Sequence, residues 1–327
     1  MPQLWRINSL KAILRVSISV LILAVAASAP AAQLSTDART AIPHDVQQLV
    51  VIDYHTMENS TAATDLKDRV MLPDLKRFEE ALHKSGLNEN HDVEQLAFAL
   101  FRVKSGDERL STVGVAQGQF AVTDILANFR KTNIKPVRLR TNRIYPLAKT
   151  DMVLCFVDPS TMVFGDNDAV EKALDARDGV TSSLLTNAPM MDAMRAVDSE
   201  PLWSILDKKG TQTMLKQVLG EAGAGSTNDL ETVSKRLESS WYSMNFQHGV
   251  KFDLTISTGD SFSAATLTSL LSAGLAVRKV SGTEAEKQAL SATSIASDSG
   301  RMTIHFATSD AQFASLLQSP LFQSMVH

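Results

Sequence analysis

The chain has 327 residues, of which 44% are hydrophobic and 21% are charged, and its formal net charge is -4. This composition excludes a disordered chain, because the apolar content is high and the net charge is small. A single cysteine excludes a disulfide-stapled scaffold, and a mean hydropathy of -0.03 excludes a polytopic membrane protein. A balance this close to neutral gives no sign of a nucleic-acid partner.

The first 31 residues have the three-part pattern of a secretory signal peptide. Basic residues precede an apolar run at 16–27, and small residues follow it. The run is shorter than the ~20 residues that a membrane-spanning helix needs. Ala29 and Ala31 satisfy the small-x-small rule, so cleavage is expected after Ala31. The pattern is typical of bacterial secretion and predicts a periplasmic or extracellular mature chain without a transmembrane span. The alternative is that the segment is retained as an anchor.

Periodicity predicts the elements of the first half. In chain order they are a strand at 48–54, a helix that begins at Pro73 and ends at Gly86, strands at 93–103 and 110–120 joined by a turn at 105–107, a helix at 122–131, strands at 136–147 and 152–164, and a helix at 168–176. Strands in adjacent hairpins with interspersed helices favour an α+β fold.

The second half repeats this order. It is predicted to contain a strand at 202–206, part of a helix at 214–219, a hairpin of strands at 237–247 and 250–258, a helix at 263–280, a strand at 301–307 and a helix at 310–317. Two stretches are expected to be flexible loops without regular secondary structure. They are the Gly- and Ser-rich residues 220–228 and residues 281–299.

Two local correspondences indicate an internal repeat. A hairpin strand followed by a helix occurs at 113–129 and at 252–271, and a strand followed by a short helix occurs at 161–174 and at 302–317. We therefore expect two similar halves, each a mainly antiparallel sheet of about four strands with helices packed on one face. The halves are lobe 1 (32–180) and lobe 2 (181–327), with the boundary in the polar stretch 178–187. The alternative is chance recurrence of common α+β units.

This order resembles uncharacterised secreted bacterial proteins built from tandem α+β halves. The resemblance rests on Ile42-Pro-His-Asp45 before the first strand, Gly114-Val-Ala-Gln-Gly118, and Met162-Val-Phe-Gly-Asp166 before a helix. It covers most of the mature chain and implies a role in the periplasm or envelope, with no activity attached.

The string Gly259-Asp-Ser261 resembles the nucleophile block of GDSL-type esterases. However, that block should come first in the chain, and no aspartate stands three residues before His305. A serine hydroxyl without a histidine to accept its proton is a poor nucleophile. Helix capping explains the polar residues better, with Asp260 or Ser261 before one helix, Asn167 or Asp168 before another, and Thr123 or Asp124 in the first half.

The sequence predicts no catalytic residues, metal site or cofactor. Asp53 and His55 share a face at the end of a strand, but a zinc site needs three or four converging ligands. No H-x-x-x-H pair or EF-hand loop is present. The glycines at 220–225 follow a helix, so they do not form a phosphate-binding loop between a strand and a helix.

The strongest local charge pattern lies at 130–149, which carries seven cations and no acid. Arg138 and Arg140 alternate with apolar residues, so both are expected on one face of a strand. We predict that Lys135, Arg138, Arg140 and Arg143 form an anion-binding site for a ligand or an acidic partner. The alternative is an exposed edge whose charges discourage aggregation.

Together these observations predict a secreted or periplasmic non-catalytic protein that binds a ligand or partner at the cell envelope. The partner would be an envelope component or an anionic ligand, and not nucleic acid, because no aromatic ladder accompanies the basic residues. Enzymatic activity is less expected but stays open. One alternative is a periplasmic serine hydrolase that uses Ser261. Another is an interaction module that pairs through an exposed strand edge such as 136–147.

Overall fold

The computed structural model describes residues 33–71, 73–84, 86–87, 89–102, 110–147, 151–221, 228–320 and 322. The expected signal peptide at 1–31, its cleavage point and the turn at 105–107 lie outside the described residues. The described chain combines helices with antiparallel strands, which confirms the predicted α+β class.

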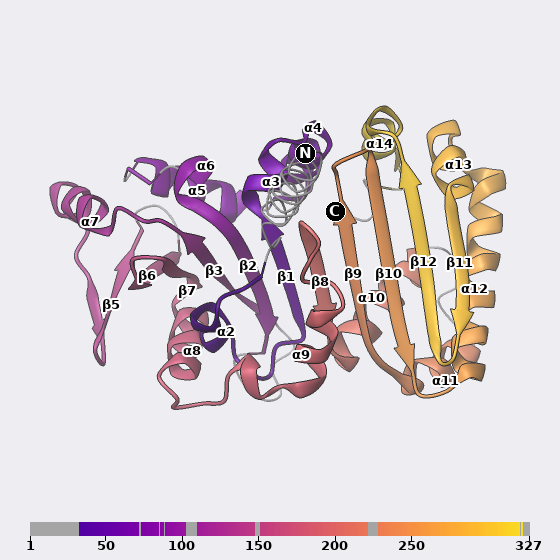
Figure 1. Ribbon diagram of the computed structural model, residues 1–327, viewed down its shortest axis with the longest axis horizontal. Helices are drawn as coiled ribbons and strands as arrows, with labels where there is room; N and C mark the ends of the chain where they lie inside the picture. Colours follow the sequence, from indigo (N-terminus) through magenta and orange to yellow (C-terminus); the bar gives the residue numbers. More distant parts are fainter. Residues whose placement is uncertain are drawn as a thin grey trace, which may run out of the picture.

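Twelve strands form one antiparallel sheet (Figure 1). In their order across the sheet they are β11 (Thr293–Asp298), β12 (Arg301–Thr308), β10 (Val250–Thr258), β9 (Leu237–Asn245), β8 (Leu202–Leu206), β1 (Gln48–Asp53), β2 (Val93–Phe101), β3 (Ser111–Gly118), β7 (Thr161–Asp166), β6 (Met152–Asp158), β5 (Asn142–Pro146) and β4 (Val137–Leu139). The sequence predicted a separate sheet of about four strands in each half. Instead, the sheet continues from one half into the other.

The two halves meet at β1 and β8. These strands pair antiparallel, with Leu49 opposite Ile205 and Val51 opposite Trp203. All five residues of β8 are buried, and β1 carries apolar residues on both of its faces. Such strands would expose apolar side chains and unpaired backbone groups at the edge of a sheet. Pairing them removes two edges, which is why one sheet forms.

The strands follow the same chain order on both sides of this junction. Outward from the junction, lobe 1 has β1, β2, β3, β7 and β6, and lobe 2 has β8, β9, β10, β12 and β11. Lobe 1 continues with the β4–β5 hairpin, which has no equivalent among the described strands of lobe 2. The predicted correspondences fall on β3 with its following helix against β10 with its helix, and on β7 against β12.

The helices connect these strands. They are α2 (Thr36–Thr40), α3 (Tyr54–Glu58), α4 (Thr61–Val70), α5 (Pro73–Lys84), α6 (Glu89–Asp92), α7 (Val122–Lys131), α8 (Asn167–Arg177), α9 (Ala188–Arg195), α10 (Lys208–Glu221), α11 (Asn228–Arg236), α12 (Ser261–Ser281), α13 (Glu284–Ser291) and α14 (Asp310–Leu317), with a 3-10 turn at Leu184–Thr186. Helices α7 and α14 have the predicted bounds, and α5 begins at Pro73 as predicted.

Two segments predicted as single strands are hairpins. The segment 136–147 turns at Arg140, whose φ of 54° lies in the left-handed region, and forms β4 and β5. The segment 152–164 turns after Asp158, whose Oδ1 accepts hydrogen bonds from the Ser160 N–H and hydroxyl. In both cases a polar turn without glycine interrupts a long apolar pattern, so the strand pattern alone concealed the turn.

The stretch 281–299 was expected to be loose but forms α13 and β11. Thr283 and Glu286 cap α13 reciprocally. Ser299 and Gly300 both have positive φ and close the two-residue turn between β11 and β12. Few apolar residues mark this segment, because β11 is a polar edge strand.

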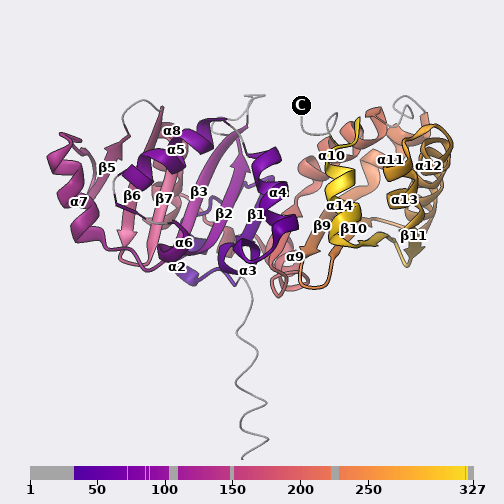
Figure 2. The same ribbon diagram turned by 90° about the horizontal axis from the view of Figure 1, so that it is seen from above.

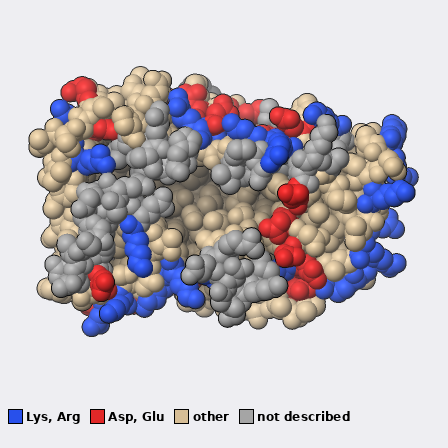
Figure 3. Space-filling model, turned by 180° about the vertical axis from the view of Figure 1, so that it is seen from behind, with Lys and Arg blue, Asp and Glu red and all other residues tan. Residues whose placement is uncertain are grey.

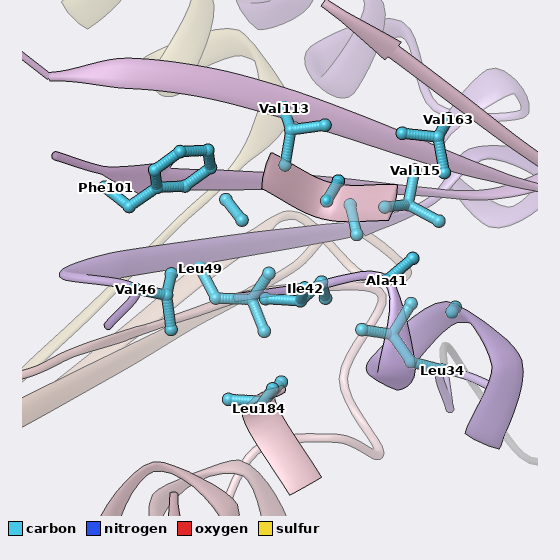
Figure 4. Packing of buried hydrophobic residues seen from close by; sticks show 14 of the residues in the cluster. Leu34, Ala41, Ile42, Val46, Leu49, Phe101, Val113, Val115, Val163 and Leu184 are labelled. Carbon is cyan, nitrogen blue, oxygen red and sulfur yellow. The ribbon is translucent and has the colours of Figure 1, made fainter. Parts of the chain in front are cut away.

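Leu49, Val51 and Trp203 lie on one face of the sheet, which we call the front face. Helices α2 and α9 pack on this face and lie on the viewer's side of the sheet in Figure 1. In lobe 1 this face is packed by α2, α8 and the 3-10 turn, and on β8 and β9 of lobe 2 it is packed by α9. Figure 4 shows part of the cluster, in which Leu184 lies opposite Leu49. Cys155 belongs to this cluster, where burial raises the pKa of its thiol. On β10, β12 and β11 none of the described helices lies on the front face (Figure 1).

The rear face carries three further clusters. The first lies in lobe 1 beneath α5 and α7, and includes Leu82, Ile125 and Phe129. The others lie in lobe 2, one beneath α4 and α14 and one beneath α10, α11 and α12. The described helices therefore cover both faces of the sheet in lobe 1, but only the rear face on the outer strands of lobe 2.

No helix among the described residues combines the length and apolar character needed to cross a membrane.

Candidate functional site

The four predicted anion-binding residues all lie in or beside the β4–β5 hairpin, at one end of the sheet. Arg140 is committed to internal ion pairs, with its Nη1 2.6 Å from Asp175 Oδ1 and its Nε 3.4 Å from Asp178 Oδ2. The sequence predicted that Arg138 and Arg140 lie on one face of a strand. Arg140 instead stands in the turn after β4, so the two side chains do not share a strand face. Lys135 precedes β4 and is exposed.

Arg138 and Arg143 lie directly opposite each other on β4 and β5. Both side chains are exposed, and neither forms an ion pair with another described residue. Like charges in this position disfavour the hairpin slightly, but they also guard an edge strand against pairing with other chains. The anion-binding role of this pair stays a prediction.

Asp178 anchors the same hairpin to the end of α8. It accepts hydrogen bonds from Arg177 Nε at 2.8 Å and Asn142 Nδ2 at 3.2 Å, in addition to Arg140. Partial burial alone would raise the pKa of Asp178, but its hydrogen bonds with Arg177, Asn142 and Arg140 outweigh this and hold the pKa below its usual value.

Asp178→Asn is therefore expected to lower the free energy of unfolding by about 1–2 kcal/mol at pH 7. A depressed pKa contributes stability that is complete above the unfolded value of about 3.9 and is lost as the pH falls through the folded value. The difference between wild type and variant should thus shrink at pH 3. Urea denaturation at both pH values measures it.

The matched control is Asp192→Asn, which removes an exposed pair with Arg195 within α9 and should change little. An equal loss in the Asp178 variant at pH 7 and pH 3 would show that its charge is not the cause.

The aspartates that drew attention in the sequence cap helices. Asp53 Oδ1 accepts from the Thr56 N–H at 2.9 Å at the start of α3, and Asp260 Oδ1 accepts from the Ser263 N–H at 2.7 Å at the start of α12. The cap of α8 is Asp166, one residue before the predicted Asn167. Helix α7 begins after Ala121 without a side-chain cap, so the capping role predicted for Thr123 or Asp124 was wrong.

Ser261 is the exposed first residue of α12. Among the described residues no side chain hydrogen-bonds to its hydroxyl. His305 is committed elsewhere, because its Nδ1 lies 2.7 Å from Oδ1 of Asp253, its neighbour across β12 and β10. The described residues also contain no group of three His, Cys, Asp or Glu side chains that could hold a metal ion.

A different site lies on the rear face, where the surface is hollowed near its middle (Figure 3). The floor visible there consists of atoms from residues other than Lys, Arg, Asp and Glu. Rear-facing positions of β1, β2, β8, β9 and β10 follow from the cross-strand pairs, and none is charged. Figure 3 is the view of Figure 1 turned from front to back, so the middle of the rear face corresponds to β1 and β8, and the hollow lies over the junction of the two lobes.

The floor is apolar and only half-buried. The half-buried hydrophobic residues at rear-facing positions are Val50 and Ile52 on β1, Leu96, Phe98 and Leu100 on β2, Tyr242 and Met244 on β9, and Phe252 and Leu254 on β10. Val50 belongs to none of the buried clusters on either side. The packed helices thus leave a gap over β1.

Three uncharged polar side chains meet in this floor. Gln48 Nε2 donates to Ser204 Oγ at 3.3 Å, and Tyr242 lies directly across from Ser204 on the neighbouring strand β9. Ser204 is fully buried. Burial raises the pKa of Tyr242, so the phenol stays protonated at physiological pH. We call Gln48, Ser204 and Tyr242 the polar trio.

Helices border the hollow on the rear face. Helices α3, α4 and α14 lie at the end of β1 near Asp53, and α4 packs against α14 from the other lobe (Figures 1 and 2). Lys67 of α4 fixes this end, because its Nζ donates to Glu79 Oε1 of α5 at 2.7 Å and to the Tyr54 hydroxyl at 2.9 Å. Helix α10 lies at the opposite end.

Sequence reasoning missed this site. The signal was present in β1, where Leu49, Val50, Val51 and Ile52 form an unbroken apolar run typical of a central strand. Its partner β8 is 154 residues away, and the half-exposure of its rear face depends on where the helices stop. The sequence alone does not determine either fact.

The structure defines an α+β protein with one continuous antiparallel sheet and an uncharged hollow over the centre of that sheet. No family model matches the chain, and no curated protein matches it in sequence. Among the solved structures that share the fold are two crystal forms of TP0453. Crystal form I of TP0453 aligns with a TM-score of 0.51 and 11% identity, over 89% of this chain and 98% of that chain. Crystal form III of TP0453 gives 0.51 and 11%, over 87% and 99%. At this identity the likeness concerns the fold alone.

Proposed function

We propose that this protein is a non-catalytic binding protein whose rear hollow holds an elongated, largely apolar molecule. The observation that carries the proposal is the half-exposed apolar floor over β1. Apolar surface left in water costs about 25 cal/mol per Å², and a concave apolar surface with a few convergent polar groups is the usual form of a ligand site.

The polar trio narrows the ligand class. Its groups are neutral, and no rear-facing position of the neighbouring strands is charged. A buried charge without a partner is strongly disfavoured, so the ligand should place an uncharged hydroxyl or ester group against the trio. An acylglycerol with a hydrocarbon chain along the floor satisfies this chemistry, whereas a free carboxylate does not.

The location and origin of the site are part of the same proposal. The signal-peptide pattern at 1–31 supports a protein that acts in the periplasm or outside the cell. The shared strand order of the two lobes supports an internal duplication, in which the hollow formed where the first strands of the two copies paired. The basic hairpin at Arg138 and Arg143 would then guard the sheet edge rather than bind the ligand.

The test uses the uncharged dye N-phenyl-1-naphthylamine, whose fluorescence rises in apolar surroundings, and competition by 1-monooleoylglycerol or oleate. We expect wild type to bind the dye and monooleoylglycerol to displace it better than oleate. Val50→Trp and Leu100→Trp should each remove dye binding, because an indole on β1, or at Leu100 on the adjacent strand β2, fills the gap over β1. Tyr242→Phe should bind the dye normally, but its affinity for monooleoylglycerol should be about 3- to 10-fold lower, which corresponds to the loss of one hydrogen bond.

Val137→Trp is the matched control, since it adds an indole at an exposed position of β4. It should bind both molecules like wild type. Absence of dye binding in wild type, or unchanged binding in both tryptophan variants, would contradict the proposal.

A further inference from the structure

Helix α12 has an outer face without charge. Its exposed residues are Ser261, Phe262, Ala265, Ser269, Ser272, Ala273, Ala276, Val277, Val280 and Ser281. Phe262, Val277 and Val280 are 79%, 64% and 82% exposed. A surface helix ordinarily places charged residues on its outer face, and 21% of this chain is charged. The outer face of α12 is therefore suited to contact with another surface.

Strand β11, beside this helix, is an unguarded sheet edge. The two-residue turn after Asp298 makes Asp298 and Arg301 a hydrogen-bonded pair. Because such pairs alternate, Thr293, Ile295 and Ser297 direct their backbone N–H and C=O groups away from β12. The first five residues of β11 include no Lys, Arg or Pro, whereas the opposite edge, β4, is three residues long and carries Arg138.

The two features form one continuous side of the molecule. Helix α12 packs behind β11 through the cluster that contains Leu267, Leu271 and Ile295. Both elements lie at the same end of the protein in two perpendicular views (Figures 1 and 2). A single partner that covers both must present a strand edge and a charge-free helix with matching spacing.

We infer that this partner is a second copy of the same chain. A two-fold axis perpendicular to the sheet places β11 antiparallel to β11 of the second copy, which extends the sheet through both molecules, and places α12 against α12. A two-fold interface must be complementary to itself, and a surface without charge meets this requirement while a surface of one charge sign does not. The small side chains of Ala265, Ser269, Ala273 and Ala276 allow the two helices to approach closely.

Sizing with light scattering on the purified secreted chain tests this inference. We expect wild type to have twice the chain mass. Ala273→Glu, which places a charge on the outer face of α12, should weaken dimer association at least tenfold. Ser297→Pro should do the same, because it removes an outward N–H while leaving the pairing with β12 intact. Both changes fall at exposed positions, so the monomer should stay folded by circular dichroism.

Ala311→Glu is the control, since it adds the same charge at an exposed position of α14 and should leave the dimer unchanged. A monomeric wild type at 100 µM chain, or a dimer insensitive to both variants, overturns the inference. Co-sedimentation with phosphatidylcholine vesicles distinguishes the other occupant. A monomeric wild type that binds vesicles, and loses binding in Ala273→Glu, would show that α12 contacts lipid instead.

Discussion

Replacement of Trp203 by alanine is expected to lower the free energy of unfolding by about 3–5 kcal/mol. Trp203 is fully buried and lies on β8, opposite Val51 of β1. Its ring belongs to the front-face cluster at the β1–β8 pair, where the two lobes join in one sheet. The lost burial and the remaining cavity both act on this junction, so the effect should be among the largest for a single substitution.

The companion variant Trp203→Phe separates packing from hydrogen bonding. Among the described residues the buried Trp203 Nε1 has no hydrogen-bond partner, so phenylalanine removes volume but no hydrogen bond. Its cost should therefore be much smaller than that of alanine. Urea denaturation followed by circular dichroism measures both, and equal losses in the two variants would refute the packing argument.

The same experiment examines the continuity of the sheet. If β1 and β8 couple the lobes, wild type and Trp203→Ala should each unfold in one transition. Two separated transitions in wild type would mean that the lobes are independent despite their shared sheet. Two transitions in the alanine variant alone would mean that Trp203 provides most of the coupling.

Local elements were predictable where an apolar period and a terminating residue coincide. The predicted bounds of α7, α14, β8 and β10 are those of the structure. Prediction failed where a turn consists of residues that also suit strands, as at Arg140, and where an edge strand such as β11 has little apolar content. In these places the tertiary context, rather than the local sequence, decides the conformation.

The candidate site was harder to predict, because it depends on partners far apart in the chain. Ser204 reaches Gln48 only through the pairing of β8 with β1, and Tyr242 reaches both through the pairing of β9 with β8. The charged residues at 130–149 were conspicuous in the sequence, yet Arg140 forms ion pairs with Asp175 and Asp178 that hold the β4–β5 hairpin against α8. A local charge pattern thus drew attention to an edge of the sheet, while the uncharged centre was marked only by the apolar run of β1, which is typical of any central strand.

Gly114→Ala is expected to destabilise the protein by about 1–3 kcal/mol. Gly114 lies on β3 opposite Phe164 of β7, and the phenyl ring covers it. A Cβ atom at Gly114 would lie 2.2 Å from Phe164 Cζ, well inside van der Waals contact. Because the φ of Gly114 is not positive, alanine suits the backbone, and the cost arises from displacement of the ring.

The Phe164 ring has little room to move. It is 4% exposed and packs edge-on against Phe98 at a centroid distance of 6.0 Å. A double-mutant cycle with Phe164→Leu tests this geometry, since the smaller side chain vacates the space that the new methyl group needs. The double variant should lose less than the sum of the single losses, with a coupling energy of at least about 1 kcal/mol. Additive losses would mean that the ring does not cover Gly114, and that a glycine within β3 requires another explanation.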